Sequence, residues 1–262
     1  MNIKNIQFYP KRLLIKKQQN SIKINRLIFM KFETSIQDII PRTHDVTSFR
    51  FPRPKELQYK PGQYFFVTIK QDGKEISNPF SFSTSPTETD YIEFTKKLTD
   101  HEYSIALKAT KIGDWAKIDA PYGKLTYEGE YPKIALLCGG IGITPFRSII
   151  KNATDKNLNN KITLFYGCRT EEDIPFKTEL EELSQKNNNL KIFIVLSQAS
   201  PNWKGATGHI TAEIIQKELP DFKDTTFYAC GPPPMVKAMQ GIIEKLGLPK
   251  EQLKLELFTG YP

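Results

Sequence analysis

The pattern of hydrophobic and polar residues changes near residue 132 and divides the chain into two halves. Before this point, short aromatic and β-branched runs are interrupted by Pro, Gly and Asp at short intervals. Such runs are typical of strands in an antiparallel sheet or barrel. They lie at 62–69, 78–84, 91–98 and 115–123, with one helix-compatible segment at 102–110. We therefore expect an antiparallel β-barrel domain over residues 30–131.

From residue 132 onward, apolar runs alternate with amphipathic segments. This alternation predicts a parallel sheet with helices on both faces. The expected strands are 133–140, 161–167, 190–197, 225–231 and 253–258, and the expected helices are 143–153, 175–186, 211–219 and 233–247. Residues 132–262 are thus predicted to form a doubly wound α/β domain, and the order 3-2-1-4-5 is one that such sheets adopt.

Three glycines stand directly after the first strand of the second half, in the stretch LLCGGIGITPF at residues 136–146. Glycine lets the backbone approach an anion, and a helix N-terminus offers unpaired N–H groups and partial positive charge. A plain turn needs one glycine, whereas Gly139, Gly140 and Gly142 together favour a phosphate nearby. We expect Thr144 to cap the next helix and Pro145 to lie in its first turn.

A second special turn, YACGPPPM at residues 228–235, ends another predicted strand. In a doubly wound sheet, ligands bind at the carboxyl ends of strands where the strand order reverses. With the order 3-2-1-4-5, the first and fourth strands are neighbours at that point. The sequence therefore predicts that the turns at 138–140 and 230–232 lie side by side and form a nucleotide crevice.

These stretches, together with NPFSFSTSP at 78–86 and APYG at 120–123, resemble the ferredoxin-NADP reductase superfamily of flavoprotein oxidoreductases. The resemblance runs from Met30 to the C-terminus and implies a barrel that holds FAD and a second domain that binds NADH or NADPH. It implies an NAD(P)H-dependent enzyme that passes a hydride to FAD and electrons to an unidentified acceptor. A flavin reductase with weakly bound flavin, or an electron-transfer subunit of a larger complex, stays open.

The resemblance also assigns roles to individual residues. It places the family's Arg-x-Tyr-Ser flavin motif on Asn78, Pro79, Phe80 and Ser81, so that Ser81 would bond near the flavin N5. The other implied positions are Ser104 for the FAD diphosphate, Gly139, Gly140, Gly142 and Thr144 for the nicotinamide nucleotide's diphosphate, Cys230 with Gly231 and Pro232 beside the nicotinamide, and Tyr261 over the flavin face. Ser81 and Cys230 are the expected catalytic residues.

This chain departs from the family motif at two positions, with Asn78 in place of the arginine and Phe80 in place of the tyrosine. A charge-assisted hydrogen bond contributes about 1.5–3 kcal/mol, so the missing arginine would weaken FAD binding by roughly 10- to 100-fold. Lys96 or Lys97, at the end of a predicted strand, would offset this loss. The alternative is that these two lysines are ordinary solvated residues at a strand end.

The nucleotide preference depends on the residues after the third strand of the second half. Members of the family that prefer NADP often carry Ser-Arg there, whereas this chain has Ser197 and Gln198, with no cation until Lys204. We therefore expect NADH to be preferred over NADPH. Arg169, after the second strand, is the residue that could hold a 2′-phosphate instead.

The net charge of +8 is concentrated at the N-terminus. Residues 1–29 hold seven Lys and Arg and no acid, which leaves 30 basic against 29 acidic residues in the rest. The nearly neutral body predicts no nucleic-acid partner. The basic extension is either a targeting or lipid-surface arm or a segment upstream of a working start at Met30, and the second interpretation is favoured. No apolar run approaches the ~20 residues of a membrane span.

The three cysteines, Cys138, Cys168 and Cys230, form neither an even disulfide framework nor a metal-binding spacing. The three histidines also lack such a spacing. We expect no metal site, and a reducing compartment, the cytoplasm.

Overall fold

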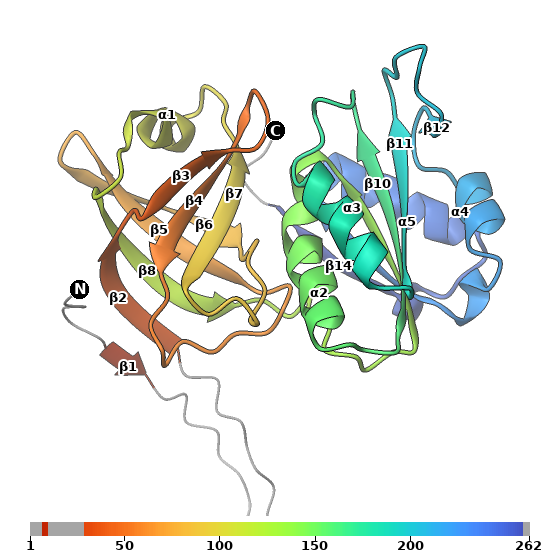
Figure 1. Cartoon of the computed structure of the whole chain (residues 1–262), viewed down its shortest axis with the longest axis horizontal. Coiled ribbons are helices and arrows are strands. Elements are labelled where there is room, and N and C mark those ends of the chain that lie inside the picture. The colour runs from red at the N-terminus through yellow and green to blue at the C-terminus, as the bar shows by residue number, and fades with distance from the viewer. Residues whose placement is uncertain (1–6, 10–28, 259–262) are drawn as a thin grey trace, which may run out of the picture.

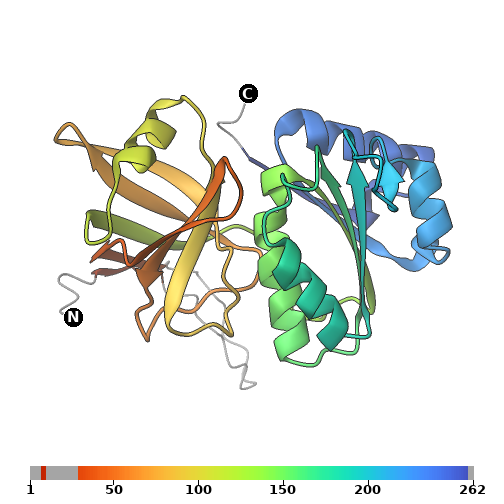
Figure 2. The same cartoon turned by 45° about the horizontal axis from the view of Figure 1, so that its top comes forward.

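The computed structural model describes residues 7–9 and 29–258, which form two domains side by side (Figure 1). The turned view in Figure 2 shows the same separation, with helix α2 on the side of the second domain that faces the barrel. The last strand of the first domain, β8, ends at Tyr122, and the first strand of the second, β9, begins at Lys133. Leu125 and Tyr127, in the connecting segment, are buried in the core of the second domain.

The first domain consists of two antiparallel sheets that enclose one core, as the sequence predicts. The strand orders are β1-β2-β8-β5-β6 and β3-β4-β7. The strands are β1 (Gln7–Tyr9), β2 (Phe29–Ser35), β3 (Asp38–Pro41), β4 (Val46–Pro52), β5 (Tyr64–Gln71), β6 (Lys74–Ser81), β7 (Tyr91–Lys97) and β8 (Trp115–Tyr122), and the helix α1 (Glu102–Ala109) lies between β7 and β8.

Aromatic side chains fill the centre of the barrel. The ring of Phe80 stacks on that of Phe94 with 4.3 Å between centroids, and Phe65 stacks on Phe82 at the same separation. Because side chains alternate between the two faces of a strand, one face of each sheet supplies these rings. The large buried rings thus hold the strands that carry the expected flavin motif.

The N-terminal extension contributes a strand that the sequence analysis does not anticipate. Strand β1 pairs antiparallel with β2, so that Gln7 lies opposite Lys31 and Tyr9 opposite Phe29. The other residues before Phe29 lie outside the described part of the chain. The proposed working start at Met30 stays a prediction.

The second domain is a six-stranded parallel sheet between two layers of helices. Its order, β12-β11-β10-β9-β13-β14, confirms the expected order 3-2-1-4-5 and adds a two-residue strand at one edge. The strands are β9 (Lys133–Gly139), β10 (Lys161–Cys168), β11 (Leu190–Leu196), β12 (Ala206–Thr207), β13 (Thr226–Gly231) and β14 (Leu253–Leu257). The helices are α2 (Ile143–Asp155), α3 (Lys177–Lys186), α4 (Ala212–Glu218) and α5 (Pro233–Lys245).

Alternating residues of the central strands bury two separate cores. Leu136, Leu164 and Tyr228 pack under α2 and α3, whereas Leu137 and Phe227 pack under α4 and α5. Figure 1 shows α2 and α3 on the side of the sheet toward the barrel. The helix that starts at the glycine turn is therefore also the helix that meets the flavin domain. Within the described residues, no helix is long and apolar enough to cross a membrane.

One local expectation is wrong. Helix α2 begins at Ile143, as predicted, but its N-cap is Gly142, so Thr144 is inside the first turn and is not the cap. Its hydroxyl donates to the Ile141 carbonyl at 3.2 Å. Pro145 lies in the first turn, as expected.

Candidate active site

A cavity of about 360 Å³ lies between the two domains and is lined by residues of both. Strands β5 and β6 supply its barrel side, and the start of α2 and the end of β14 supply the opposite side. The lining residues are Tyr64, Pro79, Phe80, Ser81, Thr95, Gly123, Lys124, Ile141, Thr144, Glu256, Leu257 and Phe258. Residues as far apart in the sequence as Tyr64 and Phe258 thus line one cavity. The size of this cavity is within the range of cofactor sites.

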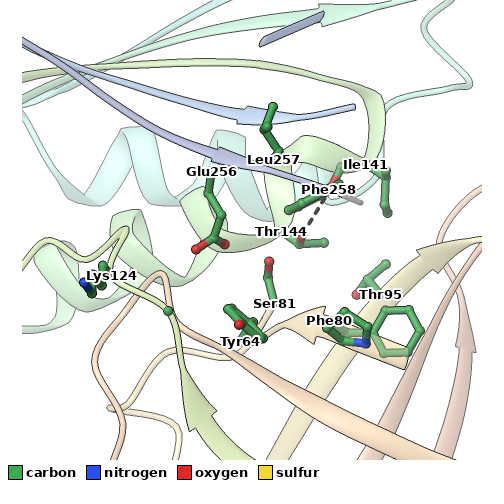
Figure 3. Close-up of a pocket in the computed structure, with 12 residues that line it drawn as sticks. Tyr64, Phe80, Ser81, Thr95, Lys124, Ile141, Thr144, Glu256, Leu257 and Phe258 are labelled. Atoms are coloured by element: carbon green, nitrogen blue, oxygen red, sulfur yellow. Dashed lines mark hydrogen bonds between the residues drawn. The ribbon is translucent and has the colours of Figure 1, made fainter. Parts of the chain in front are cut away.

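Two polar groups are directed into this cavity from opposite domains. Figure 3 shows the Ser81 hydroxyl and the Glu256 carboxylate pointing into the same space, near Tyr64. The Ser81 side chain is buried, and its hydroxyl has no hydrogen-bond partner among the described residues. A buried polar atom without a partner costs free energy. This hydroxyl is therefore placed for a hydrogen bond to a ligand.

Gly123 explains how the cavity stays open beside Tyr64. Its φ is +96°, and a Cβ there would lie 2.9 Å from the Tyr64 ring and 3.2 Å from the Glu256 carboxylate. Only glycine adopts this conformation without strain. The APYG segment thus contributes shape to the site.

Burial raises the pKa of Glu256 to about 7 from an ordinary value of 4.5. The folded state holds this proton more tightly than the unfolded state. The contribution of the Glu256 carboxyl to the free energy of unfolding is therefore complete below pH 4.5 and is lost as the pH rises through about 7.

We expect the stability gained by Glu256→Gln in the flavin-free protein to grow by up to about 3 kcal/mol between about pH 5 and pH 8. Denaturant unfolding across this range measures it. Glu251→Gln, at an exposed position, is the control, and equal pH profiles for the two variants would contradict the prediction.

A second cavity, of about 490 Å³, lies at the carboxyl ends of β9, β10 and β11. Gly139, Gly140, Arg169 and Ser197 line it from these strand ends, and Lys97 lines it from the barrel. The sequence predicts a crevice between the turns at 138–140 and 230–232. The cavity includes the first of these turns, but residues 230–232 do not line it. Ile141 lines both cavities, so the two sites adjoin at the glycine turn.

The three glycines of this turn have different roles. Gly139 and Gly140 line the nucleotide cavity, and Gly140 has φ +48° with open space where a Cβ would be. A Cβ on Gly142 would lie 2.5 Å from the Cys230 carbonyl oxygen. Gly142 is therefore required for α2 to pack on β13. It lines neither cavity, and its contact with the nucleotide stays a prediction.

Cys230 ends β13 beside the glycine turn, as predicted, and pairs with Cys138 on β9. Its side chain is fully buried in the core under α2, and it lines neither cavity. The expectation that this thiol faces the crevice is wrong in this structure, because the alternation along β13 turns Tyr228 and Cys230 toward the same core. Burial raises the pKa of Cys230 well above its ordinary value. Its catalytic role stays a prediction.

Gly231 and Pro232 form the start of the next helix. Gly231 is buried with φ +149°, and a Cβ there would lie 2.5 Å from the Met235 side chain. Pro232 is the N-cap of α5. Both residues shape the turn, as expected, and neither lines a cavity in this structure.

Only some of the other residues predicted to bind the flavin line the first cavity. Pro79 and Phe80 line the first cavity, whereas Asn78 is half-buried and does not. Ser104 is fully buried and its hydroxyl lies 3.2 Å from that of Thr99, so its predicted contact with a diphosphate is not apparent. Tyr261 lies outside the described residues.

Lys96 is not a solvated residue at a strand end. Its side chain is only 6% exposed, and its ammonium lies 6.0 Å from the centre of the Phe80 ring. Burial lowers the pKa of Lys96 to about 8. A buried cation beside the flavin motif fits the compensation for Asn78.

The sequence analysis did not identify Glu256, Tyr64 or Phe258. Glu256 and Phe258 flank Leu257 at the end of the last strand, and the predicted terminal aromatic was instead Tyr261. A polar residue between apolar ones at the end of β14 is the sequence signal that could have found Glu256. Its burial depends on the barrel, which no local pattern reveals.

Comparisons with known proteins agree with this geometry. The model of an oxidoreductase FAD-binding domain matches residues 33–127, and that of an oxidoreductase NAD-binding domain matches residues 136–241. The chain is 36% identical over 222 residues to NADH-cytochrome b5 reductase 1 of Aspergillus terreus, covering 79% of this chain and 75% of that protein. It is 34% identical over 229 residues to the Dictyostelium discoideum protein of the same name, covering 84% and 78%.

Solved structures share the whole two-domain arrangement. The cytochrome b5 reductase domain of Ulva prolifera nitrate reductase superposes with a TM-score of 0.76 at 24% identity, covering 86% of this chain and 96% of that one. A ferredoxin NADP+ reductase from Neisseria gonorrhoeae, with bound FAD and NADP, gives 0.76 at 22% identity, covering 87% and 98%. These similarities are in fold.

The fold, the two adjoining cavities and the matched domains define a flavoprotein oxidoreductase with one domain for FAD and one for a nicotinamide nucleotide. The chain belongs to the ferredoxin-NADP reductase superfamily and is an NAD(H)-dependent FAD oxidoreductase of the cytochrome b5 reductase type. The residues that line the first cavity fit the cofactor, because the buried Ser81 hydroxyl has no partner among the described residues and offers a polar contact that a flavin would use. The buried Lys96 does not line the cavity, but it lies beside Phe80, which does.

Proposed function

We propose that this chain oxidises NADH and delivers the electrons to a small electron-transfer protein of the cytochrome b5 class. The observation that carries the proposal is that the nucleotide cavity and the flavin cavity adjoin at Ile141. The names of its relatives in Aspergillus terreus and Dictyostelium discoideum support the class of acceptor. Bound FAD would accept a hydride from NADH and release electrons one at a time.

The residues of the chain would bind, orient and shield the reacting groups. Gly139 and Gly140 would seat the nucleotide diphosphate, whereas Thr144 lines the flavin cavity and not the nucleotide cavity. The Ser81 hydroxyl would bond to the flavin ring, and Lys96 would supply positive charge near it. The carboxyl of Glu256, with a pKa of about 7, can hold or release a proton inside the cavity near neutral pH.

A second function, a flavin reductase that releases its flavin, is favoured by Asn78 alone. Asn78 stands where the family has an arginine, and it does not line the cavity.

A relative named as the reductase component of propane 2-monooxygenase, from a Gordonia species, is 30% identical over 235 residues. That name favours a reductase that works with partner proteins.

The proposed function is tested by purifying the protein, recording its visible spectrum and measuring NADH oxidation with cytochrome b5 or with free FAD as acceptor. Retained flavin and rapid reduction of cytochrome b5 would support the proposal. Flavin-free protein that oxidises NADH only with added free FAD would support the flavin reductase instead. Absence of NADH oxidation with either acceptor would contradict both functions.

A cytoplasmic location is part of the same proposal. Cys138 and Cys230 occupy paired positions on neighbouring strands, and both remain free thiols. Unpaired cysteines at neighbouring positions are consistent with a reducing compartment.

The nucleotide preference gives a separate prediction. Arg169 and Asp173 line the nucleotide cavity, and the Arg169 Nε lies 3.3 Å from a carboxylate oxygen of Asp173. A 2′-phosphate that approached Arg169 would therefore also meet this carboxylate. We expect kcat/KM to be higher for NADH than for NADPH, and Asp173→Asn to raise the NADPH value about tenfold.

Steady-state kinetics with both nucleotides measures this preference, and Glu172→Gln, at an exposed neighbouring position, is the matched control. A wild-type enzyme that uses NADPH more efficiently than NADH would contradict the prediction. Arg169→Ala would then show whether Arg169 holds the 2′-phosphate.

A further inference from the structure

Arg147 is a buried cation at the boundary between the two domains, outside both cavities. It lies on α2, one turn after Thr144, and is only 4% exposed. Arginine is almost never buried in proteins unless it is paired. The contacts of its guanidinium group therefore indicate what it does.

The guanidinium group joins both domains through charged and backbone partners. Nη1 donates to the Ser83 carbonyl oxygen at 2.8 Å and to Glu88, both in the barrel domain. Nη2 donates to the second Glu88 oxygen at 2.9 Å and to Glu179 on α3. Arg147 is thus held bidentately by one carboxylate of the flavin domain, a geometry that fixes orientation as well as distance.

The neighbouring residue on α2 adds a second bond between the domains. Ser148 Oγ donates to the Thr84 carbonyl oxygen at 2.6 Å, and both residues are fully buried. Helix α2 therefore holds two consecutive carbonyls of the barrel, Ser83 and Thr84. A segment bound at two successive backbone positions can neither slide nor tilt freely.

The electrostatic balance of this cluster requires all its members. Burial opposes the charge of Arg147, but the two carboxylates outweigh it, and the pKa of the guanidinium is raised. Burial likewise opposes the charge of Glu88, but hydrogen bonds from Arg147 outweigh it, and the pKa of Glu88 is lowered. Removing the cation would leave buried carboxylates without a counter-charge.

A third contact reaches the loop that lines the nucleotide cavity. Phe176 has φ +61°, an unusual conformation for a residue with a side chain. Arg42 of the barrel lies 4.7 Å from its ring centre, and Arg147 lies 5.8 Å from it. The loop before α3 is thus attached to both domains.

These bonds join the elements that carry the two cofactors. Helix α2 begins at the glycine turn of the nucleotide cavity, and Ser83 follows Ser81 by two positions. We propose that Arg147, through Ser83 and Glu88, is a positioning residue that fixes the flavin domain against the nucleotide domain and so sets the approach of the nicotinamide to the flavin. The expected effect on the rate of flavin reduction rests on the proposed function, whereas the expected effect on the distance between the domains does not.

The test compares Arg147→Met, which removes the charge, with Arg147→Lys, which keeps it. Lys133→Met is the matched control, because Lys133 pairs with Asp221 inside the nucleotide domain. Each variant carries spin labels on cysteines at Ile112 and Lys217, which are exposed and lie in different domains. The native cysteines are buried, so labelling is selective.

We expect one narrow distance distribution in the parent and in the Lys133→Met control. Arg147→Met should broaden it, and Arg147→Lys should restore much of it. In flavin-loaded protein, Arg147→Met should lower the limiting rate of flavin reduction at saturating NADH by about tenfold or more, because displacement by about 1 Å has a large effect on rate. The Kd for NADH and reduction by dithionite should change little.

A merely structural role would lower the thermal stability but leave the distance distribution and the rate per flavin-loaded molecule unchanged, and this result would overturn the proposal. If Arg147→Met does not fold, Glu88→Gln combined with Ser148→Ala is expected to broaden the distribution, and an unchanged distribution would overturn it equally. If NADH fails to reduce the flavin of the parent protein, the proposed function is contradicted. The distances between the spin labels would still test the role of Arg147.

Discussion

Replacing Gly142 by alanine is expected to abolish flavin reduction by NADH and to destabilise the nucleotide domain by about 3 kcal/mol, the upper end of what overpacking costs. A Cβ at this position would lie 2.5 Å from the Cys230 carbonyl oxygen and 3.4 Å from the Cys138 Cβ. The first of these atoms belongs to the backbone of a central strand, so it cannot move aside. Helix α2 would have to shift, and the glycine turn with it.

Denaturant unfolding and rapid mixing with NADH measure the two effects. Gly241→Ala is the matched control, because Gly241 lies in α5 with nothing within 4 Å of an added Cβ. That replacement is expected to be neutral or to stabilise the protein by up to about 1 kcal/mol, since alanine is the better helix former. Equal stability of the two variants would show that Gly142 is not needed for packing.

The second large effect is expected at Ser81, where stability and activity should change independently. Its buried hydroxyl has no partner among the described residues and faces the flavin cavity. Ser81→Ala should therefore leave the flavin-free protein as stable as before, or slightly more stable. Flavin reduction by NADH should slow about tenfold, which corresponds to about 1.4 kcal/mol and to one lost hydrogen bond.

Ser83→Ala is the matched control from the same segment. The Ser83 hydroxyl donates to Glu93 Oε1 at 2.8 Å and accepts from Thr95 at 3.0 Å, so its loss leaves buried partners unsatisfied. We expect this variant to lose about 1–3 kcal/mol of stability. Its rate of flavin reduction per loaded molecule should be close to that of the wild type. If Ser81→Ala also loses stability while its rate of flavin reduction stays close to that of the wild type, Ser81 is not part of the site.

The sequence predicts the architecture because the signals for strands, turns and helices are local. The alternating apolar runs give the strands of the barrel, and the glycine and Gly-Pro turns lie at the ends of the neighbouring strands β9 and β13, as predicted. The order of the parallel sheet follows from the general preference of doubly wound folds. Helix α1 is also found where the sequence expects it.

The roles of single residues are less predictable, because they depend on contacts across the fold. Gly142 resembles its neighbours in the sequence, but only the position of the Cys230 carbonyl shows why it must lack a Cβ. The same strand alternation that predicts a core on each face also turns the Cys230 thiol away from the crevice. A pattern of residue types does not reveal which side of a strand end the ligand occupies.

Glu256 and Arg147 illustrate the same limit for charged groups. The sequence analysis assigns no role to Arg147, because its partners Glu88 and Glu179 are 59 and 32 positions away in the sequence. Glu256 is an ordinary acid until the barrel covers it and burial raises its pKa to about 7. Electrostatic roles thus emerge only when the two domains are together.

The central claim is that the two adjoining cavities of this chain carry electrons from NADH to FAD. The most direct test is to mix flavin-loaded protein with one equivalent of NADH in the absence of oxygen and to follow the visible flavin absorbance. We predict rapid and nearly complete bleaching in a single turnover. If dithionite bleaches the flavin but NADH leaves it oxidised, the claim is contradicted.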